Sequence, residues 1–119
     1  MVTKELVIQY FDAINSGNWQ SFVDETFDYV VLDTDKVMKG KEAYLKGAGQ
    51  FFSMCTHVVI KEVLINKSKV SVLSRYTLNN TKNQEMLLDV SEFLTFSENN
   101  KLNASSIFFD SQKLNNFLK

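Results

Sequence analysis

Proline is absent from this chain of 119 residues, and cysteine and histidine occur once each. Turns must therefore be built from Gly, Asn, Asp and Ser. The single cysteine, Cys55, excludes a disulfide within the chain, and together with His57 it supplies too few ligands for a structural zinc site. The sequence also lacks the P-loop, G-x-G-x-x-G and G-x-S-x-G motifs. We therefore expect no bound metal and no cofactor.

Charge of one sign does not dominate, and long apolar runs are missing. The net charge is −1 and no dense run of Lys or Arg occurs, which argues against a nucleic-acid partner. No stretch approaches the roughly 20 apolar residues that a membrane-spanning helix needs. The first ten residues have the pattern of a helix rather than of a signal peptide. The sequence thus predicts a soluble, cytoplasmic protein without a membrane partner.

What the chain does contain is ample apolar bulk. Hydrophobic residues make up 45% of it, and ten of its residues are phenylalanine. A chain of this length forms one domain, residues 1–119, and buries roughly two-thirds of its unfolded surface. The phenylalanines supply enough volume either to fill a core or to line an apolar cavity.

The pattern of apolar residues predicts helices first and strands afterwards. Periodicity of 3.6 residues indicates three N-terminal helices, at residues 3–16, 19–26 and 41–54. Short β-rich runs at 27–33 and 37–38 lie between the last two. Four long strands follow, at 56–66, 69–79, 84–97 and 101–110, and the last residues, 111–119, form either a helical turn or a frayed tail. Short polar turns between adjacent strands predict an antiparallel meander, so the fold class is α+β.

One residue breaks the alternation of the third long strand. Successive side chains of a strand point to opposite faces of the sheet, so one face of this strand carries mostly apolar residues together with Glu92. That face consists of Gln84, Met86, Leu88, Val90, Glu92, Leu94 and Phe96. Because an unpaired buried charge is not tolerated, Glu92 indicates a polar pocket within an apolar core. The alternative is a carboxylate at the rim of the sheet, solvated or paired with Arg75.

Four segments, in order and at sensible spacing, resemble the nuclear-transport-factor-2-like superfamily, which includes ketosteroid isomerase, scytalone dehydratase and the SnoaL-like polyketide cyclases. They are residues 10–19 (YFDAINSGNW), 30–33 (VVLD), 39–43 (KGKEA) and 107–110 (IFFD). The resemblance covers nearly the whole chain. It implies a cystatin-like cone, in which three N-terminal helices pack on a curved, mainly antiparallel sheet and enclose a pocket. Members place different chemistries in that pocket, so the fold alone does not decide the function.

Ketosteroid isomerase gives the sharpest comparison for the site. Its mechanism uses a carboxylate base, together with a Tyr and a protonated Asp that hydrogen-bond the developing oxyanion. The resemblance places Tyr10 at the position of that tyrosine and Glu92, one methylene longer than Asp, at the position of the protonated acid. It places Thr34, which cannot act as a carboxylate base, at the base position between Asp33 and Asp35.

Three residues are candidates for moving a proton. Asp33 and Asp35 flank the base position, and His57 titrates near neutrality. Each has a structural alternative as well: Asp is common in turns, and a lone histidine is more often a surface residue. Tyr10 has one too, as a core aromatic whose hydroxyl reaches a nearby acceptor. Asp110 either caps the last turn or faces the pocket.

Four further residues are predicted to contact a ligand, namely Thr34, Trp19, Phe52 and Phe108. The first interpretation of the chain is a SnoaL-like pocket protein that binds an apolar or aromatic small molecule carrying a carbonyl or hydroxyl group. If it is an enzyme, the expected chemistry is cofactor-free isomerisation, dehydration or cyclisation. The alternative is a non-catalytic module for ligand binding, dimerisation or protein interaction.

Apolar residues on both faces of the long strands also suggest a homodimer. In the strand at 56–66, alternation assigns His57, Val59, Val63 and Ile65 to one face and Val58, Ile60 and Leu64 to the other. One face packs on the helices, and the other is free to pack on a second subunit.

Overall fold

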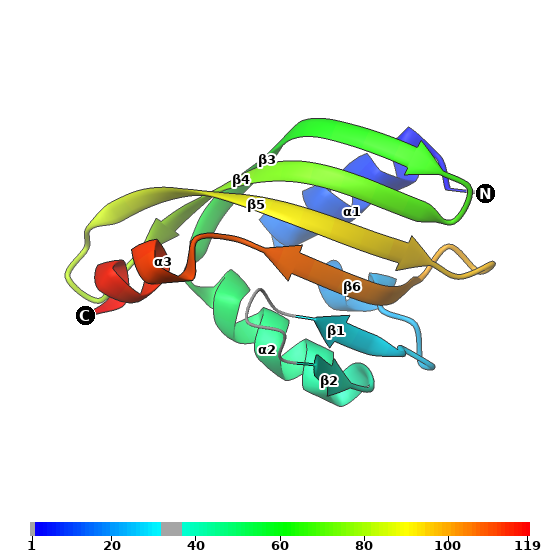
Figure 1. The fold of residues 1–119 in the computed structure, drawn as a ribbon, viewed down its shortest axis with the longest axis horizontal. Coiled ribbons are helices and arrows are strands. Elements are labelled where there is room, and N and C mark those ends of the chain that lie inside the picture. Colours follow the sequence, from blue (N-terminus) through cyan, green and yellow to red (C-terminus); the bar gives the residue numbers. More distant parts are fainter. Residues whose placement is uncertain (1, 32–36) are drawn as a thin grey trace.

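Six strands form one curved sheet on which three α-helices pack, in a computed structural model that describes residues 2–31 and 37–119 (Figure 1). The helices are α1 (Lys4–Ser16), α2 (Lys41–Ser53) and α3 (Ser111–Leu118), with a short 3-10 helix, η1 (Trp19–Phe22). The strands are β1 (Tyr29–Val31), β2 (Val37–Lys39), β3 (Cys55–Asn66), β4 (Lys69–Asn79), β5 (Glu85–Phe96) and β6 (Leu102–Phe108). The α+β cone predicted from the sequence is confirmed.

The strand order across the sheet is β2-β1-β6-β5-β4-β3. The four long strands β3 to β6 form the expected antiparallel meander, because each turn between them is short. β1 pairs in parallel with β6 and antiparallel with β2. Joining the two short strands to the meander extends the sheet beneath α2, and Figure 1 shows α2 alongside β1 and β2 while α1 lies behind the long strands.

Alternation on β5 is confirmed, and it directs Glu92 inward. Leu88, Val90, Glu92 and Leu94 are buried, whereas Leu87, Asp89 and Phe93 are exposed. β4 follows the same rule, with its even-numbered residues from Val70 to Leu78 buried. The face that these strands share with α1 forms most of the core, because α1 contributes Val7, Tyr10, Phe11 and Ile14 to it.

A register shift in β3 changes the predicted alternation there. The pairing with β4 skips one residue between Ile60 and Glu62, which is the mark of a β-bulge. Because of this bulge, Val63 and Ile65 share the core-facing side with Val58 and Ile60, and the prediction that placed Val63 and Ile65 opposite them was wrong. Leu64 accordingly lies on the outer face, with 74% of its surface exposed.

The second predicted helix, residues 19–26, is also corrected. Only residues 19–22 are helical, and they form the 3-10 helix η1. The helix stops there because Val23 is extended (φ −85°, ψ 127°) and pairs with Leu102 of β6 in a β-bridge. Trp19 and Val23 are buried. Only two of the α-helices are therefore N-terminal, and the third, α3, follows β6. Asp110 caps α3, since its carboxylate accepts a hydrogen bond from the Lys113 amide at 3.0 Å.

Among the described residues, no helix is both long and apolar enough to cross a membrane.

Candidate functional site

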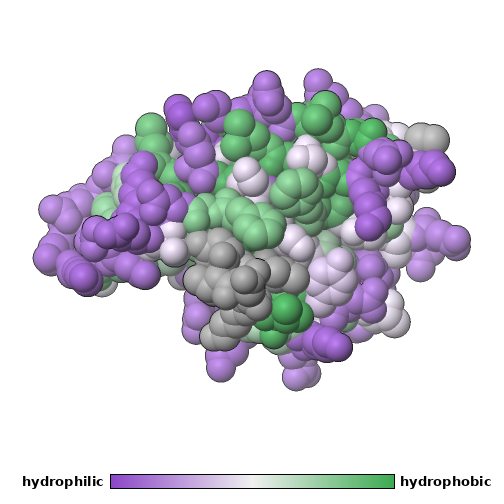
Figure 2. Space-filling view, viewed as in Figure 1, coloured by the Kyte–Doolittle hydropathy of each residue, from purple (hydrophilic) through white to green (hydrophobic). Residues whose placement is uncertain are grey.

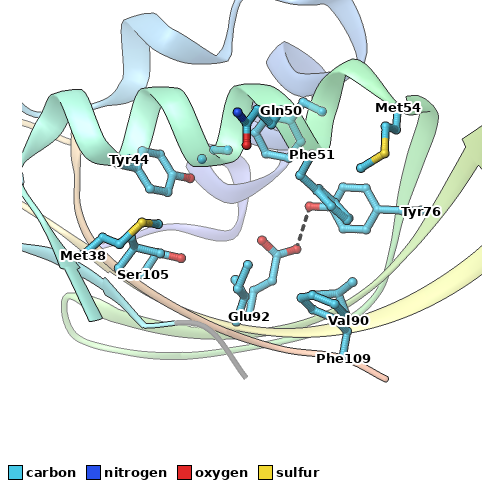
Figure 3. Close-up of a pocket in the computed structure, with 15 residues that line it drawn as sticks. Met38, Tyr44, Gln50, Phe51, Met54, Tyr76, Val90, Glu92, Ser105 and Phe109 are labelled. Atoms are coloured by element: carbon cyan, nitrogen blue, oxygen red, sulfur yellow. Dashed lines mark hydrogen bonds between the residues drawn. The ribbon is translucent and has the colours of Figure 1, made fainter. Parts of the chain in front are cut away.

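A cavity of about 310 Å³ lies between α2 and the inner face of the sheet (Figure 3). Its walls are largely apolar and include Met38, Phe51, Phe52, Met54, Ile107 and Phe109. Its polar side chains among the described residues are Tyr44, Gln50, Tyr76, Glu92 and Ser105. Neither Lys, Arg nor His occurs among the described lining residues. Such a mixture, apolar walls with a few polar groups, is typical of small-molecule pockets.

The Glu92 carboxyl is held from one side. The hydroxyls of Ser74 and Tyr76 both donate to its Oε2 atom, at 2.6 and 2.9 Å. Both donors come from β4, where they lie on the same inner face as Glu92. None of the described residues hydrogen-bonds the other oxygen, Oε1, which points into the cavity in Figure 3. The carboxyl therefore presents one free oxygen to whatever occupies the cavity.

The protonation of Glu92 is set mainly by its burial. Only 4% of the residue is exposed, and this desolvation raises the pKa of the carboxyl from its ordinary 4.5 to about 7. The hydrogen bonds from Ser74 and Tyr76 act in the opposite direction, because they favour the ionised form. Since Oε2 already accepts two hydrogen bonds, the neutral acid carries its proton on Oε1. Below neutral pH, Glu92 is then a hydrogen-bond donor that faces the cavity.

Two tyrosines form a second polar pair. The hydroxyls of Tyr10 and Tyr44 lie 2.9 Å apart, and both residues are buried. Tyr44, on α2, lines the cavity, whereas Tyr10, on α1, lies behind it and does not. Burial raises the pKa of both hydroxyls, so both remain neutral. Tyr10, predicted to lie beside a ligand, is thus joined to the cavity through its hydrogen bond with Tyr44.

Of the predicted ligand contacts, Phe52 lines the cavity. Trp19 is buried one layer further out, where its ring packs edge-on against Phe52 with 4.9 Å between ring centroids. Phe108 lies on the outer face of the sheet, 40% exposed and packed against Phe93. Because side chains alternate along the strand, its neighbour Phe109 faces the cavity instead.

Of the predicted proton-transfer residues, His57 is the one that the structure describes, and it does not line the cavity. His57 is exposed near the start of β3, in a groove beside α1 that also contains Asn15. Asp33, Thr34 and Asp35 lie outside the described residues. Cys55, partly buried at the start of β3, is an unreactive thiol at neutral pH because burial raises its pKa to about 12.

Arg75 does not pair with Glu92. It lies on the outer face, where its Nε atom donates to Asp89 at 2.8 Å across the β4–β5 pair. The reading of Glu92 as a rim carboxylate paired with Arg75 is therefore wrong.

Ser74, Tyr76 and Ser105 are among the polar residues of the site that the sequence reasoning missed. Ser74 and Tyr76 share one face of β4 with Val70, Val72 and Leu78, which is the same signal that identified Glu92. The pattern that found one polar residue on a buried face could have found these two as well. Ser105 gave no such signal, because alternation groups it with Lys101 and Asn103.

Comparison with known proteins gives solved structures only. Neither a protein-family model nor a curated protein sequence matches the chain. A structure described as a SnoaL-like polyketide cyclase from Jannaschia sp. CCS1 superposes with a TM-score of 0.80 at 15% identity, covering 96% of this chain and 89% of that one.

Two further structures contain ligands. TerC, co-crystallised with polyporic acid, superposes with a TM-score of 0.77 at 10% identity, covering 95% of each chain. A protein with a ketosteroid isomerase-like fold from Catenulispora acidiphila DSM 44928, in complex with trimethylamine, gives a TM-score of 0.72 at 14% identity, covering 92% of this chain and 88% of that one. These likenesses confirm the predicted resemblance at the level of fold: the chain has the cone fold of the nuclear-transport-factor-2-like proteins.

Proposed function

We propose that this protein binds a neutral, apolar or aromatic small molecule that carries a carbonyl or hydroxyl oxygen. The observation that carries the proposal is the free Oε1 atom of Glu92, directed into a cavity whose walls are otherwise mostly hydrocarbon and aromatic. Apolar walls provide binding free energy without direction, whereas a buried donor fixes the position of one ligand oxygen.

The electrostatics of the cavity disfavour an anionic ligand. An anion would meet no positive side chain among the described lining residues, and it would face the ionised form of Glu92 above neutral pH. The structural neighbours that hold trimethylamine and polyporic acid support the use of this fold to bind small molecules.

A second candidate function is cofactor-free acid–base chemistry, favoured by the pKa of about 7 at Glu92. A general acid is most effective when its pKa lies near the working pH. In this role Glu92 would donate its proton to a ligand carbonyl as an enol forms, which is the first step of an isomerisation or a cyclisation. The base that removes the carbon-bound proton would be Asp33 or Asp35, as proposed from the sequence, because His57 lies in a different groove.

We further propose that the outer face of the sheet joins two copies of the chain. Its exposed apolar residues include Tyr29, Leu64, Leu87, Phe93 and Phe108, and Figure 2 shows apolar side chains gathered over the long strands. A contiguous apolar surface of this kind is typical of an interface.

The first prediction concerns stability against pH. Folded Glu92 keeps its proton up to pH of about 7, whereas the unfolded chain releases it near 4.5, so the wild-type protein loses stability as the pH rises through this window. The Glu92→Gln variant lacks this loss. Urea denaturation gives the unfolding free energy of both proteins at each pH. The value for Glu92→Gln minus the value for the wild type should increase by roughly 2–3 kcal/mol between pH 5 and pH 8. Glu98→Gln, in an exposed turn, is the control and should show no such change.

The second prediction concerns binding of 1-tetralone, a bicyclic ketone that accepts but cannot donate a hydrogen bond. Binding of this ketone requires neutral Glu92, so the dissociation constant of the complex should rise about tenfold between pH 6 and pH 8. In Glu92→Gln the amide can donate at every pH, and the constant should stay level. Isothermal titration calorimetry measures both. Equal pH dependence in the two proteins would refute the role of Glu92, and absence of binding would refute the pocket proposal itself.

The third prediction separates catalysis from binding. If the pocket catalyses enolisation, 1-tetralone in D₂O should exchange its α-protons for deuterium about 100-fold faster with the wild-type protein than with Glu92→Gln, as followed by proton NMR. If the wild-type protein and Glu92→Gln give equal exchange rates while both bind 1-tetralone, this chemistry is ruled out and the binding function alone is supported.

The fourth prediction concerns the dimer. Native mass spectrometry should show a dimer for the wild-type chain and a shift toward monomer for Phe93→Ser, because the substitution removes an apolar contact from the centre of the outer face. Ile8→Ser, which alters a similarly exposed residue on α1, should leave the dimer intact. A monomeric wild-type chain would contradict the proposal.

A further inference from the structure

Ser105 is a buried polar residue without a hydrogen-bond partner for its side chain. It lies on β6, only 1% exposed, and its hydroxyl lines the cavity described above. Among the described residues, its Oγ atom is the one side-chain oxygen or nitrogen without accessible surface that has no partner, since the free Oε1 atom of Glu92 is open to the cavity. The other buried polar side chains, Ser74 and Glu92, hydrogen-bond each other.

An orphaned hydroxyl is unusual in a well-packed core. Most buried polar groups are hydrogen-bonded, because burying one without a partner lowers stability. The serine hydroxyl therefore weakens the unliganded protein unless something in the cavity bonds to it. Residues of this kind, costly to the fold, are typical of binding sites.

The position of Ser105 relative to Glu92 follows from the sheet register. Glu92 pairs with Ile107 across the β5–β6 ladder, so Ser105 is its diagonal neighbour on the same face. Diagonal neighbours lie roughly 7–8 Å apart at their Cα atoms. Figure 3 shows the Ser105 hydroxyl and the free oxygen of Glu92 directed toward the same space, with Tyr44 on the facing helix.

We propose that Ser105 is a specificity-determining residue that binds a second oxygen of the ligand, so that the pocket selects hydroxylated ketones over ketones with a single oxygen. This inference rests on the proposed binding function and adds the class of ligand. Glu92 binds the carbonyl oxygen, and Ser105 binds a hydroxyl a few ångströms away on the same face of the ligand. A serine hydroxyl both donates and accepts, so it can pair with a ligand hydroxyl in either direction.

The apolar walls restrict what lies between the two oxygens. Phe51 and Tyr76 stack edge-on, with ring centroids 5.0 Å apart, and Phe109 approaches Phe51 at 6.2 Å. These rings offer faces and edges to an aromatic or alicyclic ligand skeleton. The resulting ligand has two oxygens on one edge, toward the sheet, and an apolar body toward the phenylalanines.

The test compares 1-tetralone with the hydroxy-1-tetralone isomers that carry the hydroxyl group at position 2, 4, 5, 6 or 7, by calorimetry at pH 6. At least one isomer should bind the wild-type protein about 3- to 10-fold more tightly than 1-tetralone, as expected for one added hydrogen bond. Ser105→Ala should abolish that gain while leaving the dissociation constant of 1-tetralone itself within a factor of two. Ser106→Ala, which alters the adjacent side chain on the outer face, is the matched control and should retain the gain.

A second measurement separates ligand binding from a structural role. Without ligand, Ser105→Ala should have the same melting temperature as the wild-type protein or a higher one, because the orphaned hydroxyl is removed. A lower melting temperature would assign the hydroxyl a structural role and overturn the inference. The inference would also be overturned if Ser105→Ala lost affinity equally for 1-tetralone and for the hydroxy-1-tetralones. The same holds if none of the hydroxy-1-tetralones binds the wild-type protein more tightly than 1-tetralone does. If 1-tetralone and all isomers fail to bind the wild-type protein, the binding function itself fails, and this inference with it.

Discussion

The hydrogen bonds from Ser74 and Tyr76 to a single oxygen of Glu92 are the interaction on which the candidate site depends. A carboxyl that is 4% exposed among apolar side chains would be strongly unfavourable without partners. Because both donors lie on β4 and reach the same oxygen, they fix the orientation of the group and leave Oε1 directed into the cavity. The central contact of the site is thus an outcome of sheet register, because Ser74, Tyr76 and Glu92 all lie on paired strands.

Local periodicity explains why so much of the fold was predictable. The alternation on β5 depends on nothing beyond the strand, so it placed Glu92 inward before any tertiary contact was known. The long strands and α1 were found within a few residues of their ends for the same reason. The resemblance to a known fold added the curvature and the enclosed cavity, neither of which follows from periodicity.

The features that escaped prediction depend on contacts between distant segments. The bulge in β3 reverses the faces of Val63 and Leu64, and a one-residue insertion into a ladder leaves no local mark in the sequence. Tyr44 reaches Tyr10 from a helix 34 residues away. Phe108 and Phe109 are chemically identical neighbours, so only the exact register of β6 decides which one faces the cavity.

The same register also keeps the positive charge of Arg75 away from Glu92. Ser74 and Arg75 are adjacent on β4; the serine points to Glu92, and the arginine points outward to Asp89, its direct cross-strand partner. A slip of one residue would exchange them, bringing a guanidinium into the cavity. Such a cation would lower the pKa of Glu92 and keep it ionised. With the arginine outside, burial dominates, the pKa rises to about 7, and Glu92 becomes a donor below neutral pH. Alternation along one strand therefore keeps the guanidinium out of the interior and leaves Glu92 as a donor that faces the cavity below neutral pH.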